Sequence, residues 1–176
     1  MRQLRAWMAV SSALALAVPA RPELRSIGPL RLNPMHAAAV ERALAGAARR
    51  LESLECRRIL SDFRDGAGAP LQDRLDAVGV SARDYLSLIV FADGSGRRSC
   101  QGTDIMAVTA PGSRVVYVCG RHFLEAHQRS AANAEVVVLH EALHTLGLGE
   151  NPPDPLGISR RVAERCALTT APGRED

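Results

Sequence analysis

His140-Glu141-Ala142-Leu143-His144 lies between the apolar stretches 136–139 and 146–148, and it decides how this chain is expected to fold. On an α-helix, residues four apart lie on one face, about 6 Å apart along the axis, so two imidazoles can bind one cation. Glu141 follows the first histidine, so its carboxylate can reach a metal-bound water without itself acting as a ligand. The stretch therefore predicts a helix that is buried on most of its circumference and carries a metal site.

Signals on both sides of this stretch predict a helix over about 134–146. Asn133 is a plausible N-cap, Glu135 would place an acid in the first turn, and Gly147 suits the position after the last turn. A glycine in the left-handed conformation there reverses the chain. The reversal carries the following residues back toward the metal, and Glu150 is the first of them able to act as a ligand.

The stretch His140–Glu150, H-E-A-L-H-T-L-G-L-G-E, resembles the metzincin pattern H-E-x-x-H-x-x-G-x-x-H of the zincin metallopeptidases. It differs from that pattern in two ways: Glu150 stands at the third ligand position, and all four methionines precede the helix, so it lacks the metzincin Met-turn. The resemblance covers little more than the active-site helix and its exit. It implies a zinc-dependent peptidase in which His140, His144 and Glu150 hold Zn²⁺ and Glu141 is the general base.

Two other acids remain open as the third metal ligand. In the gluzincin-type arrangement this ligand is a glutamate on a second helix, and Glu164 lies in the stretch 159–166, which reads as a short helix. Asp154 is a more distant alternative. Glu150 is preferred because it follows the glycine turn, whereas arginines flank Glu164. Peptide hydrolysis passes through a tetrahedral intermediate with a negatively charged oxygen, and a hydrogen-bond donor besides zinc is expected to stabilise that oxygen. Four side chains are candidates for this donor: Tyr117, Arg121, His122 and His127.

The amino terminus has the features of a secretory signal peptide over residues 1–20. Arg2 and Arg5 precede an uncharged stretch from Ala6 to Val18, and small residues end the segment at Ala20. An uncleaved amino-terminal anchor is the alternative. The protein is thus expected outside the cell or in the periplasm, with no stable membrane insertion once the signal is cleaved. Residues 21–176 are expected to form a single zincin-like metallopeptidase domain, and the protein is expected to be a monomer.

Charge and composition argue against a nucleic-acid partner. The formal net charge is +3, and loss of the signal peptide would remove two arginines and no acids. All 22 basic residues are arginine, but 19 acids are interleaved with them and no phosphate-binding glycine loop is present. The resemblance to the zincin metallopeptidases implies a peptide or protein substrate as the partner.

The four cysteines predict two disulfide bonds in an exported chain, because the count is even and no pair has C-x-x-C spacing. Four cysteines allow three pairings. The preferred pairing joins Cys56 to Cys100 and Cys119 to Cys166, which would tie the segment after the active-site helix to a strand beside it.

The remaining pattern predicts an α+β fold, with a small twisted sheet, a long amino-terminal helix, the H-E-x-x-H helix and a short terminal helix. Apolar spacing predicts a helix from Pro34 to about residue 62, with Met35 and Leu54 among its apolar residues, and a shorter one over about 71–78. The run 85–91 reads as a strand, although buried helix is also open. Strands 105–109 and 115–119 are expected to form a hairpin, with 115–118 as an edge strand that pairs with a bound peptide.

Two alternatives to a peptidase remain open on the same residues. The site could hydrolyse a different amide or an ester. The chain could also be a non-catalytic exported binding or interaction protein on a zincin scaffold. Metal content and turnover distinguish these classes.

Overall fold

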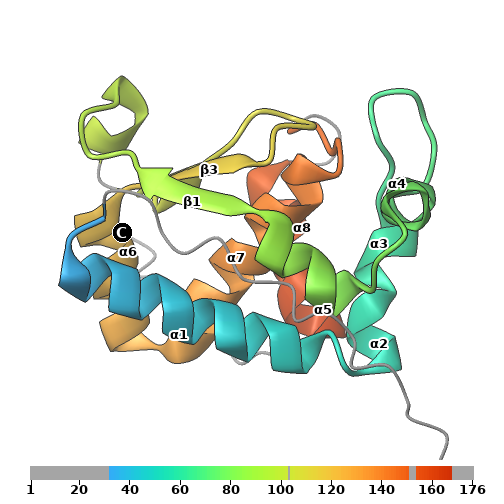
Figure 1. Cartoon of the computed structure of the whole chain (residues 1–176), viewed down its shortest axis with the longest axis horizontal. Coiled ribbons are helices and arrows are strands. Elements are labelled where there is room, and N and C mark those ends of the chain that lie inside the picture. Colours follow the sequence, from blue (N-terminus) through green and yellow to red (C-terminus); the bar gives the residue numbers. More distant parts are fainter. Residues whose placement is uncertain (1–31, 103, 151–153, 168–176) are drawn as a thin grey trace, which may run out of the picture.

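The computed structural model describes residues 32–102, 104–150 and 154–167, and within them the chain has an α+β fold (Figure 1). The helices and strands, in order, are α1 (Pro34–Arg50), α2 (Leu54–Arg57), α3 (Ile59–Asp62), α4 (Leu71–Val78), α5 (Ala82–Tyr85), a 3₁₀ turn (Leu86–Leu88), β1 (Val90–Asp93), a second 3₁₀ turn (Arg98–Gln101), β2 (Ala107–Val108), β3 (Val115–Val118), α6 (Gly120–Arg129), α7 (Ala131–Thr145) and α8 (Pro155–Arg165). The predicted fold class is confirmed.

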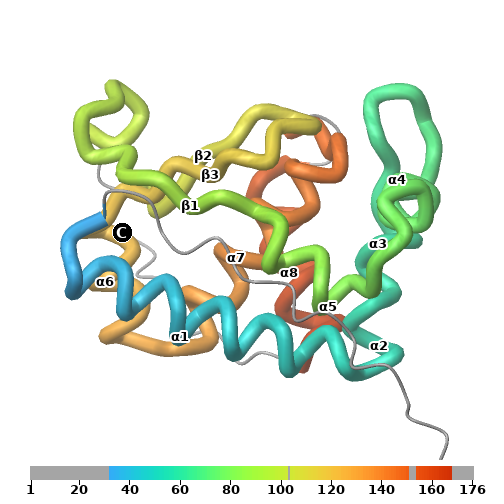
Figure 2. Tube along the Cα trace, viewed as in Figure 1, coloured from blue at the N-terminus to red at the C-terminus, as the bar shows by residue number. Residues whose placement is uncertain are grey.

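Helix α7 occupies the centre of the molecule. It contacts α1, α6 and α8 as well as β2 and β3, and every residue from Ala134 to Thr145 is buried. Figures 1 and 2 show α1 and the sheet on opposite sides, with α7 between them. Burial around the whole circumference explains why this helix is apolar on all faces, and it confirms the prediction from residues 136–139.

Helices α1 and α7 approach each other closely at Gly46. A Cβ atom on Gly46 would stand 2.2 Å from Oε1 of Glu135, so only glycine leaves room for this carboxylate. Glu135 is 8% exposed, and its carboxylate accepts a hydrogen bond from Nε of Arg50 at 3.2 Å. The expectation that Glu135 lies in the first turn is wrong, because α7 begins at Ala131 and has no acid in its first turn. Glu135 is a buried charge paired across the helix interface.

The sheet has the order β1-β3-β2. Strand β3 is parallel to β1 and antiparallel to β2, with Val90 opposite Val115 and Ala107 opposite Val118. The predicted hairpin is confirmed, but the prediction that 115–118 is an edge strand is wrong. Both edges of β3 are occupied by neighbouring strands, so a peptide could pair only with β1 or β2.

Several predicted elements have different bounds from those expected, among them β2 (Ala107–Val108 for 105–109) and α8 (Pro155–Arg165 for 159–166). Helix α1 ends at Arg50, and the continuation to residue 62 is broken into the two single turns α2 and α3. Met35 and Leu54, assigned to the apolar face, are 61% and 66% exposed. Residues 82–88 are helical, and the strand begins only at Val90, because the hydroxyl of Ser81 caps the helix by accepting from the amide of Asp84. Helix α7 starts at Ala131 after Ser130, three residues before the predicted start, so Asn133 is not its N-cap.

Two disulfide bonds join the four cysteines, but not in the preferred pairing. Cys56 is bonded to Cys166 and Cys100 to Cys119. The first bond connects α2 to the residue after α8, and the second ties the 3₁₀ turn at 98–101 to the end of β3. The prediction placed Cys166 next to the sheet. Instead, α8 packs on the side of α7 that faces α2 and α3.

Among the described residues, no helix combines the length and apolar character that crossing a bilayer requires. The predicted signal peptide lies outside the described residues.

Candidate metal centre

His140 and His144 lie one turn apart on α7, and their rings meet. Their Nε2 atoms are 2.9 Å apart and the ring centroids 4.7 Å apart. Both residues are buried, with exposures of 9% and 2%. The predicted convergence of two imidazoles from positions i and i+4 is thus confirmed.

Each imidazole also has a hydrogen-bond partner at its second ring nitrogen, Nδ1. Nδ1 of His144 lies 2.8 Å from the carbonyl oxygen of Leu148, and Nδ1 of His140 lies 3.0 Å from Oγ of Ser159. A carbonyl only accepts, so Nδ1 of His144 carries the proton, and its Nε2 presents a lone pair toward His140. The sequence analysis identified neither partner. Leu148 contributes through its backbone, and Ser159 lies on a different helix.

Glu150 returns to the histidines because the chain reverses after α7. Gly147 has φ +109°, a left-handed conformation that favours glycine, and the predicted turn is confirmed. The carbonyl of His144 accepts from the amides of both Gly147 and Gly112, at 2.9 and 2.8 Å, so the tip of the β2–β3 hairpin is tied to the end of α7. Oε1 of Glu150 then lies 3.3 Å from Nε2 of His144.

His140, His144 and Glu150 have the geometry of a metal-binding group. One ligand atom from each lies within 4.8 Å of the other two. Two ligands held tetrahedrally at about 2.0–2.1 Å from one zinc ion stand about 3.3 Å apart. The separation of His144 from Glu150 matches this value, and the two imidazoles need to part by only about 0.4 Å. The group can therefore hold a metal ion, with two nitrogens and one carboxylate oxygen as donors.

Two buried ionisable groups at the site, Glu141 and His140, also suit a bound cation. Oε2 of Glu141 is buried and finds no hydrogen-bond donor among the described residues. Burial, together with the charge of Glu150, raises the pKa of Glu141 to about 8. Burial and the neighbouring His144 lower the pKa of His140 to about 4, which keeps its imidazole neutral at pH 7 and able to act as a ligand. A cation would favour the charged form of Glu141 by direct attraction.

The two other acids considered as the third metal ligand, Asp154 and Glu164, belong to α8 and its N-cap. The side chain of Asp154 caps that helix by accepting from the amide of Gly157 at 2.8 Å. Glu164 is exposed and pairs with Arg161 at 3.6 Å. Both line a cleft of about 870 Å³ between α8 and the segment 62–68. Of the three acids proposed from the sequence, only Glu150 joins the histidine pair.

Three of the four candidate donors for the tetrahedral intermediate have other contacts. The guanidinium of Arg97 stacks 3.3 Å from the ring centre of Tyr117. Nδ1 of His122 lies 3.0 Å from the carbonyl oxygen of Ile105, and its Nε2 lies 3.1 Å from Arg121. His127 is half-buried on α6. Within the described part of the chain, no hydrogen bond or ion pair joins any of the four to the histidine pair, and their proposed role stays a prediction.

Replacing Glu150 with alanine is expected to weaken metal binding by more than the 10–100-fold typical of losing an outer partner of a ligand, because it removes a ligand outright. Glu164→Ala removes an exposed glutamate of the same type and should leave the affinity unchanged. Competition between each variant and a chelator of known zinc affinity measures both. Weaker binding in Glu164→Ala alone would exclude Glu150 as the third ligand.

The raised pKa of Glu141 predicts a pH-dependent stability for the metal-free protein. The folded state keeps the proton up to about pH 8, whereas the unfolded chain releases it above about pH 4.5. The contribution of Glu141 to the free energy of unfolding therefore falls as pH rises from 4.5 to 8. The lowered pKa of His140 contributes the opposite slope from about pH 4 to 6.5, so the net free energy of unfolding should fall between pH 6.5 and 8. Urea unfolding of chelator-treated protein at pH 6.5 and pH 8 measures the slope. Glu141→Gln should reduce it, and an equal slope in both proteins would contradict the assignment.

Comparison with protein-family models, curated proteins and solved structures finds no significant match for this chain. The site must therefore be interpreted from its own geometry.

Proposed function

We propose that this protein is an exported zinc-dependent peptidase with a zincin-like site. The single observation that carries the proposal is the cluster of His140, His144 and Glu150 beside Glu141 of α7, whose buried Oε2 has no hydrogen-bond partner among the described residues. Three protein ligands of this kind suit a catalytic zinc site, which keeps one position open for water, whereas structural zinc sites use four protein ligands. The resemblance of His140–Glu150 to the metzincin pattern adds to this support.

Zinc, when bound, would supply Lewis acidity and lower the pKa of water toward neutrality. The chain's own residues provide the rest of the chemistry. The outward hydrogen bond of His144 to Leu148 orients its ring so that Nε2 faces the site. The burial of α7 places both imidazoles in surroundings of low polarity, which strengthens electrostatic interactions there, whereas the side chain of Glu150 is half exposed.

Glu141 is the proposed general base. Its free Oε2 can accept a proton from water and then deliver it to the leaving amine. Residues at i and i+1 point in different directions from a helix, so Glu141 can stand beside the ligand set without joining it. A carboxylate that lacks a hydrogen-bond partner in a buried position is costly to keep, and this role accounts for it.

Strand β2 is the proposed place for substrate backbone to pair. It is an edge of the sheet, it runs antiparallel to β3, and it contacts α7. An extended peptide can add to such an edge through main-chain hydrogen bonds. This proposal replaces the predicted role of 115–118 and brings the peptide to an element that touches the helix with the ligands.

Digestion of a peptide library by the chain that begins at residue 21 tests the proposed function. Cleavage should stop after chelation and return when Zn²⁺ is added back at one ion per chain. A tightly bound metal with no cleavage of peptides would favour the alternative hydrolysis of another amide or an ester. Metal content well below one ion per chain would contradict the proposal and favour a non-catalytic binding protein.

A further inference from the structure

Ser159 lies on the face of α8 that meets α7, and it is the contact of that helix with the metal-binding group. Its neighbours Ile158 and Val162 are fully buried, so the inner face of α8 is fixed against the core. Oγ of Ser159 lies 3.0 Å from Nδ1 of His140. The residue is half-buried, lies nineteen residues beyond the histidine, and has no part in the proposed chemistry.

The hydroxyl of Ser159 can accept a hydrogen bond from Nδ1 of His140 in the tautomer that binds a metal through Nε2. A neutral imidazole carries one N–H, so Nε2 offers a lone pair only when Nδ1 carries the proton. That N–H needs an acceptor where it is buried, and Oγ of Ser159 is the acceptor in reach. The competing tautomer, with the proton on Nε2, donates to Nε2 of His144 at 2.9 Å. Loss of the hydroxyl would shift the balance further toward it, because Nδ1–H would then lose its acceptor. The second tautomer cannot bind a metal through Nε2.

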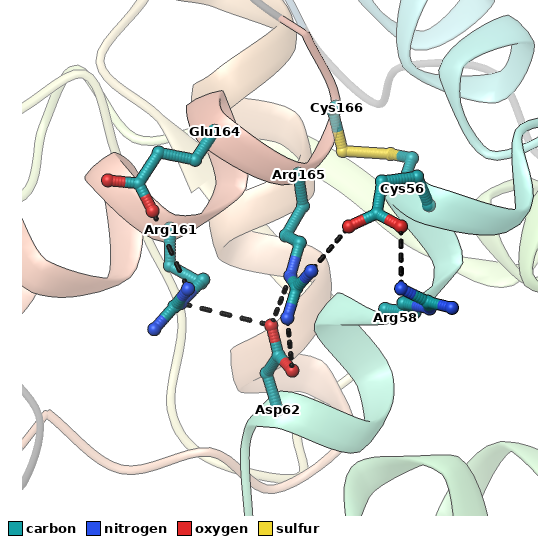
Figure 3. Close-up of polar contacts among 8 residues, drawn as sticks. Cys56, Arg58, Asp62, Arg161, Glu164, Arg165 and Cys166 are labelled. Atoms are coloured by element: carbon teal, nitrogen blue, oxygen red, sulfur yellow. Dashed lines mark hydrogen bonds and ion pairs between the residues drawn. A yellow bond between two sulfur atoms is a disulfide. The ribbon is translucent and has the colours of Figure 1, made fainter.

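The position of Ser159 depends on how α8 is attached to the rest of the chain. Figure 3 shows the contacts at its carboxyl end, which we call the α8 clamp: the Cys56–Cys166 disulfide and the ion pairs of Arg165 with Asp62 and Glu55. Nε and Nη2 of Arg165 donate to the two carboxylate oxygens of Asp62 at 2.7 and 3.1 Å. A bidentate arginine–carboxylate pair has a defined geometry. The clamp thus holds the helix against α2 and α3 as well as α7.

We propose that Ser159 is a positioning residue that keeps His140 in its metal-binding tautomer, and that the α8 clamp acts on the metal site through it. The inference rests on the metal-binding part of the proposed function and is independent of peptide hydrolysis. It makes the affinity of the site depend on a helix that contributes no ligand.

The first test compares zinc affinity in Ser159→Ala, Ser159→Thr and the control Ser61→Ala, which removes an exposed serine on α3. Chelator competition should show a 10–100-fold loss for Ser159→Ala, wild-type affinity for Ser61→Ala, and recovery in Ser159→Thr, which keeps the hydroxyl. The visible absorption of bound Co²⁺ should also change in Ser159→Ala alone, because the donor strength of His140 changes. Wild-type affinity and an unchanged Co²⁺ spectrum in Ser159→Ala would overturn the proposal, as would an unrestored affinity in Ser159→Thr.

The second test asks whether the clamp acts through the serine. Arg165→Gln keeps the disulfide and removes the pairs with Asp62 and Glu55, whereas the control Arg58→Gln removes only the pair of Arg58 with Glu55. Arg165→Gln should lower zinc affinity several-fold and Arg58→Gln should not. In the Ser159→Ala background, Arg165→Gln should cause less than about a twofold further change, because interacting residues are non-additive. Fully additive losses would overturn the link between clamp and serine.

Failure of this inference and failure of the proposed function give different results. Metal binding that depends on Ser159 in a protein that cleaves no peptide supports the positioning role and contradicts the peptidase. Peptide cleavage by a protein whose metal affinity does not depend on Ser159 supports the peptidase and contradicts the positioning role.

Discussion

Glu141→Gln is expected to keep the metal bound while lowering kcat for peptide hydrolysis by about 10²–10⁴-fold, the usual contribution of a positioned general acid or base. Glutamine has nearly the same shape, so it fits the buried position, but its amide cannot take a proton from water at neutral pH. The ligands His140, His144 and Glu150 are untouched. Metal content and steady-state kinetics on the same preparation measure both parts of the expectation.

The matched control is Glu125→Gln, which makes the same chemical change at an exposed position of α6. Its kcat should equal that of the wild-type protein. Activity retained by Glu141→Gln would remove the carboxylate from the mechanism. Loss of metal together with activity would instead assign Glu141 to the ligand set.

Removing the Cys56–Cys166 disulfide is expected to lower the free energy of unfolding by about 5 kcal/mol. The bond joins residues 110 apart in sequence, and the entropy that a crosslink removes from the unfolded chain grows with loop length. Single domains are stable by only about 5–15 kcal/mol in total. The double variant Cys56→Ala with Cys166→Ala should therefore be close to unfolding, as urea denaturation will show.

The Cys100–Cys119 disulfide offers a control with the same chemistry and a shorter loop. Its cysteines are 19 apart, for which the same relation gives about 3 kcal/mol. The difference between the two double alanine variants is the informative quantity, since the loss of buried sulfur contributes to both. A larger loss for the shorter loop would show that native packing, and not loop length, sets the contribution of each bond.

The spatial groupings that the sequence predicts correctly are local. His140 and His144 are four residues apart on one helix, and Glu150 follows within a turn whose geometry Gly147 sets. Helix periodicity and a left-handed glycine are enough to bring these groups together, with no knowledge of the tertiary fold. The bounds of α4 and the hairpin of β2 with β3 follow from similarly local patterns.

The parts that the sequence does not predict depend on long-range packing. No spacing rule distinguishes among three cysteine pairings, and the correct one depends on α8 lying against α2 and α3. The central position of β3 depends on the parallel partner β1, which comes from a separate segment. For Ser159 the only usable signal would be a hydroxyl near the middle of the terminal helix, and many exposed serines have that property.

The two amides that meet at the carbonyl of His144 have a mechanical consequence. One belongs to Gly112 at the hairpin tip, and the other to Gly147 at the helix exit. A single oxygen thus joins the strand pair, the end of α7 and the loop that leads to Glu150 into one rigid frame. A displacement of the hairpin, as when an added strand extends the sheet, would then be transmitted through one peptide group to the backbone of His144, a member of the candidate metal-binding group.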